Sequence, residues 1–549
     1  MRKTILHSTL LVVLALLLLP GCARHALDPV SDEQALKAKR WQVVIAADDG
    51  TELALTVWQP ELEAGQRAPL MLHTHGFGLQ RMDGRFGLYE NVLYTGQVAK
   101  RLWKDGAWLI TWDQRGHGDS GDTINLMEPG KEVSDVSRII DWAQDNLSHL
   151  ATVDGDPLVG MVGESYGGAV QMMASVRDPR IDAVVPVTTW YDLDLALAPG
   201  DVPKGGWMKV LYMMGDWVNF RKLPPMLREA FGDAKQGKIT ETARDYLADN
   251  QLSYYCDREQ YPQANALIIS GLRDVLFNSL QGLGARDCFR KAGRDVHLVI
   301  NRDGHLLPSK QFSNELPGWA IDNTLYCNET PLDTEQMAVD WLKGQLNMAA
   351  HPTLPSICVS VDKWGVALSE WPHPAEPLDL PPVTLKGNGS GRWEWANLPA
   401  DFLAGLATES RLSKRFAEPQ DGAWRPAFVP LHTATDAQHL VGTPHLVLTA
   451  DQQDVPVLVA LVRRQHGSAD LDIVHQQVVP VRTGKPASMP PVAVSLEAGD
   501  QLGLMLFSRH GQFNTLDLDF GKGVTFAGQV WLPPVVEHSS DSDTALSQR

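Results

Sequence analysis

The sequence has few cysteines and fewer basic than acidic side chains, and each shortage argues against a class of function. Five of the 549 residues are cysteine, and none forms a C-x-x-C pair or stands at ligand spacing from a histidine. We therefore expect neither a structural zinc site nor a thiol redox site. Lysine and arginine number 48 against 66 aspartates and glutamates, which gives a formal net charge of −18. Such a surface repels phosphate groups, so no nucleic-acid partner is expected.

Long apolar runs are also scarce, and the most pronounced one lies near the N-terminus. It covers residues 10–19, follows a basic start and is too short to span a bilayer as a helix of the finished protein. The next residues, LPGC, resemble the lipobox of bacterial lipoproteins, whose cysteine is lipidated and becomes the new N-terminus. We expect residues 1–22 to be a lipoprotein signal peptide and Cys22 to be lipidated. An ordinary secretory signal is the alternative.

Ala23 bears on where such an anchored protein resides. Enteric lipoproteins that stay in the inner membrane carry an aspartate at the position that Ala23 occupies. The expected location is therefore the bacterial cell envelope, lipid-anchored in the outer membrane and facing the periplasm or the cell surface.

Export to an oxidising compartment would allow the other four cysteines to form disulfides. Cys256, Cys288, Cys327 and Cys358 permit three pairings. We favour Cys256 with Cys288 because these two flank the apolar segment 266–274, and the other pairings stay open.

The chain is too long for one ordinary core, so we expect more than one domain. A tether at 23–41 precedes a region, 42–350, in which buried-strand runs alternate with helical stretches, a pattern that indicates a parallel sheet covered on both faces. At about 191–262 helical runs replace the strands, which predicts a cap over the carboxyl ends of the sheet. Short β-runs and frequent prolines at 351–536 predict a β-sandwich of the jelly-roll type, and 537–549 reads as a disordered tail.

The stretch VGMVGESYGGAV, residues 159–170, ends an apolar run and begins a helical one. This strand-turn-helix setting is typical of a nucleophile elbow, which leaves no room for side chains at Gly163 and Gly167 and exposes the hydroxyl of Ser165. A serine hydroxyl needs a base to remove its proton, so a histidine oriented by an acid should follow in the order Ser, Asp, His.

Asp274 and His305 fit that order. Asp274 follows the run ALIIS and His305 follows VHLVIN, so each lies at the carboxyl end of a predicted strand, where loops from adjacent strands meet the elbow. We predict Asp274 as the acid and His305 as the base. Asp303 is the rival acid, but it would have to reach back over its own turn.

Two backbone N–H groups are the candidates for the oxyanion hole. One belongs to Tyr166, directly after the nucleophile, and the other to Phe77 in HGFG, after the run APLMLHT. His73 and His75 in that stretch have no further ligand at suitable spacing, so no metal site is predicted.

Two further sites invite a catalytic role. In DQRGHGDSG, residues 113–121, we expect Asp113 and Arg115 to pair and fix the loop rather than to react. Glu164, inside the elbow, could orient the base or a substrate amine, although local packing is the commoner use of that position.

Together these motifs resemble the X-prolyl dipeptidyl-peptidase and cocaine-esterase-like serine hydrolases. The shared features, found between residues 42 and 536, are DGTELALTVWQP, DQRGHGDSG, GESYGG, SGLRD, DGH and LVGTPHLVLTA. The resemblance implies an α/β-hydrolase domain, a helical cap and a jelly-roll domain that helps to wall the active site. Members often place a tyrosine hydroxyl in the oxyanion hole where this chain has Phe77, which leaves only the backbone donor there.

The sequence thus predicts a serine hydrolase that transfers the acyl group of a small-molecule ester or a peptide to water. It would act as an acyl esterase or an X-prolyl dipeptidyl-peptidase-like enzyme, with no cofactor and no metal. The alternative is a non-catalytic surface binding protein on a hydrolase scaffold. The natural substrate, the pocket-lining residues of the cap and the oligomeric state stay open.

Overall fold

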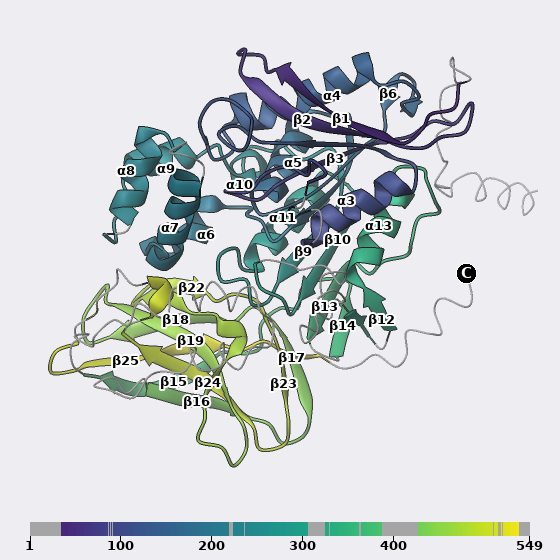
Figure 1. The fold of residues 1–549 in the computed structure, drawn as a ribbon. Helices are drawn as coiled ribbons and strands as arrows, with labels where there is room; N and C mark the ends of the chain where they lie inside the picture. Colours follow the sequence, from purple (N-terminus) through teal and green to yellow (C-terminus); the bar gives the residue numbers. More distant parts are fainter. Residues whose placement is uncertain are drawn as a thin grey trace, which may run out of the picture.

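The structure, a computed structural model, describes residues 34–536 with several gaps (Figure 1). The gaps are residues 86, 88, 90–91, 219–222, 235, 306–323, 329, 362–363, 387–426, 509, 514–517 and 519. The predicted signal peptide with Cys22, the first part of the predicted tether and the predicted tail at 537–549 lie outside the described residues.

A ten-stranded sheet forms the centre of the first domain, in the order β1-β2-β4-β3-β7-β8-β9-β10-β13-β14. Its strands are β1 (Lys39–Ala46), β2 (Glu52–Gln59), β3 (Leu70–Thr74), β4 (Trp108–Trp112), β7 (Val159–Glu164), β8 (Ile181–Val187), β9 (Asn265–Gly271), β10 (Val296–Asn301), β13 (Ile357–Val361) and β14 (Trp364–Leu368). The strands from β4 to β13 run parallel, whereas β1, β2 and β14 pair antiparallel with their neighbours. A short hairpin, β5 (Thr152–Val153) and β6 (Asp156–Pro157), lies outside this sheet.

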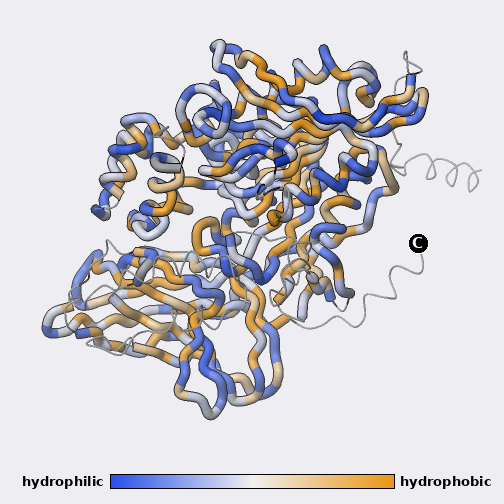
Figure 2. Tube along the Cα trace, viewed as in Figure 1, coloured by the Kyte–Doolittle hydropathy of each residue, from blue (hydrophilic) through white to orange (hydrophobic). Residues whose placement is uncertain are grey.

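The parallel strands are mainly apolar and are buried along almost their whole length, because helices cover both faces of the sheet. In β3, Leu70 and Leu72 belong to one apolar core and Met71 to the other. The first core contains side chains of α4 (Ser134–Asn146), α5 (Tyr166–Arg177) and α11 (Leu280–Lys291), and the second those of α3 (Tyr94–Lys104) and α13 (Thr334–Gln345). Figure 2 shows the apolar segments concentrated along the central strands.

A group of short helices between β8 and β9 forms the cap, at the place where the strand pattern of the sequence breaks off (Figure 1). Its elements are α6 (Leu193–Leu197), η2 (Pro199–Asp201), α7 (Gly205–Tyr212), η3 (Met213–Val218), α8 (Pro225–Ala234), α9 (Glu241–Leu247) and α10 (Leu252–Cys256). Within the described part of the chain no helix combines the length and the apolar character needed to cross a membrane.

Two disulfides tie the first domain together. Cys256, at the end of the cap, bonds to Cys288 in α11, which confirms the favoured pairing. Cys327 bonds to Cys358 and thereby joins the hairpin of β11 (Thr324–Cys327) and β12 (Thr330–Asp333) to β13.

The second domain is a β-sandwich that encloses a separate apolar core. One sheet has the order β15-β25-β18-β22 and the other β16-β24-β19-β20, with β21 also paired to β19, while β23-β17-β26 form a smaller sheet. The strands are β15 (Leu378–Leu385), β16 (Ala427–Thr433), β17 (Gln438–Gly442), β18 (His445–Ala450), β19 (Pro456–Arg464), β20 (Asp472–Ile473), β21 (Val479–Arg482), β22 (Pro486–Ser488), β23 (Val492–Leu496), β24 (Gln501–Phe507), β25 (Val524–Trp531) and β26 (Val535–Val536).

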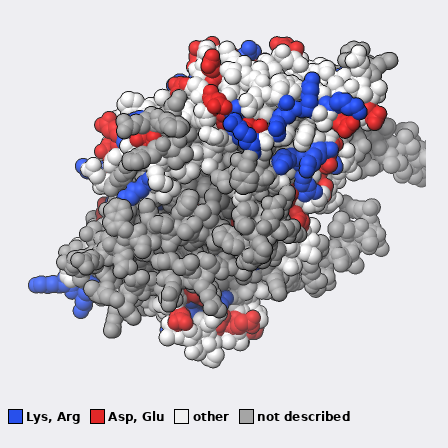
Figure 3. All heavy atoms as spheres, in the orientation of Figure 1, with Lys and Arg blue, Asp and Glu red and all other residues white. Residues whose placement is uncertain are grey.

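The large sheet continues past residue 350, where the sequence predicts the sandwich to begin. β13 and β14 add to the edge next to β10, and β15 is the first strand of the sandwich. On the face shown in Figure 3, acidic and basic side chains lie close to one another over the first domain rather than in separate zones.

Candidate active site

Ser165 occupies a strained turn between β7 and α5. Its φ of 54° and ψ of −115° lie in a backbone region that residues other than glycine rarely adopt. The surrounding structure holds this conformation: the Ser165 N–H donates to Val187 O at 2.9 Å, and the Ser165 carbonyl accepts from the Thr189 hydroxyl at 2.7 Å. The serine is thus fixed in the geometry of a nucleophile elbow.

The two glycines around Ser165 are required by close backbone contacts, as the sequence predicts. A Cβ on Gly163 would lie 2.6 Å from Gly167 O, and a Cβ on Gly167 would lie 2.5 Å from Thr74 O. Neither distance is compatible with a side chain, so β3, β7 and α5 can approach only with glycine at both positions.

The structure brings the three predicted catalytic residues together. His305 Nε2 lies 3.1 Å from the Ser165 hydroxyl, and His305 Nδ1 lies 2.9 Å from Asp274 Oδ2. With the proton on Nδ1 donated to the carboxylate, Nε2 is free to accept the serine proton. The acid that contacts the histidine is Asp274, and not its sequence rival Asp303.

Asp274 is fully buried, and both of its oxygens are engaged. While Oδ2 faces His305, Oδ1 accepts hydrogen bonds from the backbone N–H groups of Leu276 and Phe277, both at 2.9 Å. These donors fix the orientation of the carboxylate toward the histidine.

The turn that follows β3 lies directly against the nucleophile, since a Cβ on Gly76 would lie 3.7 Å from the Ser165 Cβ. In this turn, residues 76–78, side chains accept hydrogen bonds from the first and the last N–H group. The Gly76 N–H donates to the Tyr89 hydroxyl at 2.6 Å, and the Gly78 N–H donates to His117 Nε2 at 3.1 Å. Within the described part of the chain, the intervening Phe77 N–H has no acceptor. The turn therefore offers this donor to a ligand.

Tyr166 provides the second candidate donor. Its N–H stands at the start of α5 and, among the described residues, has no acceptor either. The two N–H groups that the sequence predicts for the oxyanion hole are both open, each beside the nucleophile.

His117 belongs to the loop DQRGHGDSG, and its role was not evident from the sequence. Burial lowers its pKa to about 3, so the ring is neutral. Nδ1 donates to Arg115 O at 3.0 Å, which leaves Nε2 as the acceptor for Gly78. The loop thus supports residues 76–78, the oxyanion turn, through one neutral histidine.

The prediction that Asp113 pairs with Arg115 is wrong, because each residue pairs with a different side chain. Asp113 pairs with Arg81, and Arg115 binds Asp135 through two 2.8 Å contacts and also binds Asp49. Asp113 and Arg115 are two residues apart in the sequence, but each forms its ion pair with a residue distant in sequence. A local sequence pattern does not reveal such partners. Their role in fixing the loop is as expected.

Glu164 links the elbow to the oxyanion turn. The Tyr89 hydroxyl donates to Glu164 Oε1 at 3.1 Å while it accepts from Gly76. Burial raises the pKa of Glu164 to about 7, and the nearby His305 opposes this shift. No motif of the sequence points to Tyr89, because it lies in a stretch without one.

A second buried carboxyl, Glu132, contacts the residue that follows the nucleophile. It accepts from the Tyr166 hydroxyl at 3.2 Å, and burial raises its pKa to about 7. Hydrogen bonds thus fix the side chains on both sides of the nucleophile, those of Glu164 and Tyr166.

Aromatic side chains wall the site. Phe277 and Trp207 lie with their ring centres 5.3 and 5.9 Å from that of His305, and Trp190 joins Phe277 to Tyr166. The cap closes over the turn, since a Cβ on its Gly215 would lie 2.8 Å from the ring of Phe77. The reacting atoms therefore lie beneath the cap, in mainly apolar surroundings.

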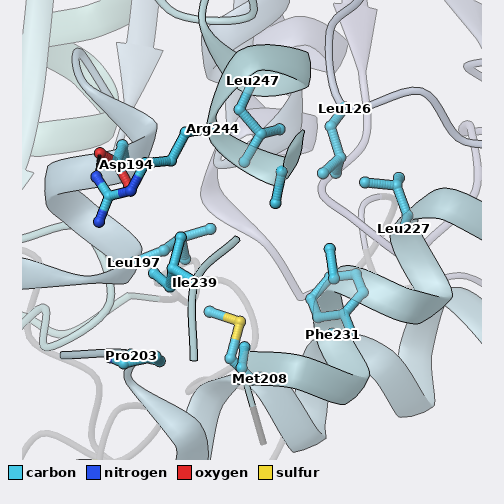
Figure 4. A pocket seen from close by; sticks show the side chains of 13 residues that line it. Leu126, Asp194, Leu197, Pro203, Met208, Leu227, Phe231, Ile239, Arg244 and Leu247 are labelled. Atoms are coloured by element: carbon cyan, nitrogen blue, oxygen red, sulfur yellow. Dashed lines mark hydrogen bonds and ion pairs between the residues drawn. The ribbon is translucent and has the colours of Figure 1, made fainter. Parts of the chain in front are cut away.

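The cap also contains an apolar cavity that no triad residue lines (Figure 4). Its volume is about 60 Å³, and it is partly open to solvent. In Figure 4, Leu126, Leu227, Phe231 and Leu247 point toward a common centre, with the ion pair of Asp194 and Arg244 at one side.

The histidines near the site hold hydrogen bonds rather than a cluster of metal ligands. His73 Nε2 lies 3.3 Å from the Thr95 hydroxyl, and His75 Nε2 accepts from Gln114 N–H at 3.0 Å. Among the described residues, no group of three or more histidine, cysteine, aspartate or glutamate side chains could hold a metal ion.

The fold and the site together define a hydrolase with an α/β-hydrolase domain and a serine nucleophile. Residues 49–306 match the model of the family described as X-Pro dipeptidyl-peptidase (S15 family), which confirms the resemblance stated from the sequence. The catalytic domain of the chain is therefore similar to that family.

Solved structures of similar fold cover almost the whole chain. An aminopeptidase from the marine sediment archaeon Thaumarchaeota archaeon has 14% identity and a TM-score of 0.64, with 94% of this chain and 99% of that one covered. A CocE/NonD family hydrolase from Staphylococcus aureus has 12% identity and a TM-score of 0.61, with 94% and 98% covered. An α-amino acid ester hydrolase has 14% identity and a TM-score of 0.59, with 94% and 100% covered. At these identities the likeness concerns the fold, and it confirms the predicted fold class.

A relative by sequence is an uncharacterized 31.7 kDa protein from the traX-finO intergenic region of Escherichia coli. The two chains are 29% identical over 151 residues, which are 27% of this chain and 44% of that protein. The chain thus matches less than half the length of this relative.

Proposed function

We propose that the protein hydrolyses carboxylic esters through an acyl-enzyme formed on Ser165. The observation that carries the proposal is the line of contacts from Ser165 Oγ through His305 to Asp274, at 3.1 and 2.9 Å, beside two open N–H groups. A nucleophile, its base, the orienting acid and two oxyanion donors are the parts that acyl transfer needs.

In the first half of the reaction, His305 Nε2 takes the proton of the Ser165 hydroxyl as Oγ attacks the carbonyl carbon. The N–H groups of Phe77 and Tyr166 receive the oxyanion, while Asp274 stabilises the protonated imidazole. The carbonyl re-forms, the bond to the leaving group breaks, and the leaving group takes the proton from His305. Water then attacks the acyl-enzyme with the same base and releases the acid.

The side chains around the base favour an ester with an apolar group over a charged peptide terminus. Phe277 and Trp207 both contact the ring of His305, and aromatic walls of this kind bind apolar acyl or alcohol groups. The second candidate is X-Pro dipeptidyl-peptidase activity, which the family match favours. Parallel assays on short-chain p-nitrophenyl esters and on an X-Pro anilide separate the two.

The nucleophile itself is tested by Ser165→Ala. We expect loss of ester hydrolysis and loss of labelling by a fluorophosphonate, with the melting temperature near that of the wild type. Ser148→Ala, at an exposed serine of the same domain, is the matched control and should keep both properties. Full activity in Ser165→Ala would overturn the proposal that the acyl-enzyme forms on Ser165. A wild type that is neither active nor labelled would also overturn it and would favour the non-catalytic binding protein.

We further propose that the protein is lipid-anchored through Cys22 in the bacterial outer membrane. The lipobox-like sequence supports this, and the two disulfides suit an oxidising compartment outside the cytoplasm. Metabolic labelling with an alkyne fatty acid should mark the wild type but not Cys22→Ala. Equal labelling of both would contradict lipidation at this residue.

A further inference from the structure

The catalytic acid sits on a short loop whose carbonyl groups are bound by side chains from two other parts of the molecule. This acid loop, residues 272–277, follows β9. Lys204 reaches it from the cap and Gln477 reaches it from the β-sandwich. Both side chains are buried, and neither belongs to the triad.

Lys204 binds the far side of the two peptide groups that hold Asp274. Its Nζ donates to Val275 O and to Leu276 O, both at 2.8 Å. The N–H groups of the same two peptides, those of Leu276 and Phe277, donate to Asp274 Oδ1 at 2.9 Å. In a trans peptide the C=O and N–H point in opposite directions, so each peptide lies between the ammonium group and the carboxylate.

This arrangement forms two short chains of hydrogen bonds with a positive charge at one end and the catalytic acid at the other. Hydrogen bonds in such chains polarise and strengthen one another in a buried setting. Among the described residues, no carboxylate forms an ion pair with Lys204, so its charge acts mainly through these peptides. Burial lowers the pKa of Lys204 to about 8, and the negative charge of Asp274 opposes this shift.

Gln477 binds two further carbonyl groups of the acid loop. Its Nε2 donates to Leu272 O at 2.8 Å and to Asp274 O at 3.0 Å, which uses both amide hydrogens. The two preceding residues, His475 and Gln476, have φ values of 53° and 60°, a left-handed backbone that is unfavourable for these residue types. The sandwich thus keeps a strained segment where it delivers Gln477 to the loop.

The cap and the sandwich are packed together close to this point, so the donors are held in place. Val202, two residues before Lys204, lies in an apolar cluster with Leu458 and Phe513 of the sandwich. A Cβ on Gly200 would lie 2.9 Å from Pro480 O. In Figure 1 the sandwich lies directly beneath α6 and α7.

We infer that Lys204 is a positioning residue for the reaction: its ammonium group acts through two peptide groups on the carboxylate of Asp274, and Gln477 fixes the loop that carries both. The inference rests on the proposed function of the triad. The positive charge of Lys204 reduces the electrostatic stabilisation that the Asp274 carboxylate gives to the protonated His305. Loss of this charge should therefore make His305 harder to deprotonate.

The test compares Lys204→Met, Lys204→Arg and Gln477→Leu in the full-length protein, with kcat and KM for a p-nitrophenyl ester measured from pH 5 to 9. For Lys204→Met we expect kcat to fall on the order of 10- to 100-fold with little change in KM. The acidic limb of kcat/KM should move to higher pH by on the order of one unit. Lys204→Arg should restore the position of the limb. Gln477→Leu should lower kcat and leave the limb in place, because it removes no charge.

Gln529→Leu, at an exposed glutamine of the sandwich, is the control and should behave as the wild type. If Lys204→Met does not fold, Lys204→Gln, which is neutral but keeps a donor, takes its place. An unchanged kcat and an unchanged acidic limb in the neutral variant would overturn the inference while the wild type stays active. A wild type that is inactive and not labelled by a fluorophosphonate would instead overturn the proposed function.

Discussion

Replacing Glu164 by glutamine tests the electrostatics of the elbow, because this carboxyl lies buried directly before the nucleophile. Burial raises its pKa from 4.5 to about 7. Below pH 4.5 the group is protonated in the folded and the unfolded chain, and its contribution to the free energy of unfolding is fully present. As the pH rises toward 7, the unfolded chain releases its proton first, so the contribution declines and is lost above the folded-state pKa. At about 1.4 kcal/mol for each pKa unit, the loss amounts to about 3 kcal/mol.

Glutamine keeps the shape of the side chain and can accept the hydrogen bond of Tyr89, but it has no proton to release. Urea unfolding followed by tryptophan fluorescence between pH 4.5 and 8 should show Glu164→Gln gaining about 3 kcal/mol on the wild type as the pH rises. Glu63→Gln, at an exposed carboxyl, should follow the wild type. If the curves of Glu164→Gln and the wild type run parallel, Glu164 is not a buried carboxyl that stays neutral toward pH 7.

Three further predictions concern the frame of the site. Replacing Cys256 and Cys288 by alanine opens a loop of 32 residues and should lower the free energy of unfolding by about 4 kcal/mol in urea titrations; an unchanged midpoint would argue against this disulfide. Gly167→Ala places a Cβ 2.5 Å from a carbonyl and should yield unstable or insoluble protein, whereas Gly232→Ala, in open space on α8, should be tolerated. His117→Ala releases the oxyanion turn and should lower kcat on the order of 10- to 100-fold with a smaller effect on KM; a wild-type kcat would show that the turn holds itself.

The fold could be predicted where burial leaves a strong local pattern. The strands β3, β4, β7, β8, β9 and β10 are covered on both faces, so each is a short apolar run, and the helices between them fix the parallel direction. The boundary near residue 350 was misplaced because β13 and β14 are short β-runs in a proline-rich stretch and resemble the strands of the sandwich. Their partner, β10, is distant in sequence, and composition does not specify it.

The triad could be found because Ser165, Asp274 and His305 each follow a strand of the same parallel sheet, whose carboxyl ends meet at one edge. Lys204 and Gln477 have no comparable local signal. In sequence, Lys204 resembles a surface lysine, and only the packing of the cap against the sandwich buries it. Their contacts with the acid loop depend on tertiary structure.

The bond from Gln477 to the acid loop has a consequence for the order in which the site is completed during synthesis. The two residues that it joins, Asp274 and Gln477, are separated by 203 positions, and the donor comes from the domain that is made after the catalytic one. A chain that emerges N-terminus first contains all three triad residues well before Gln477 is available. A chain that has emerged only in part, or one that is cleaved within the sandwich before Gln477, therefore has all three triad residues but lacks the hydrogen bonds from Gln477 to the acid loop. We expect full hydrolytic activity only once the sandwich has folded.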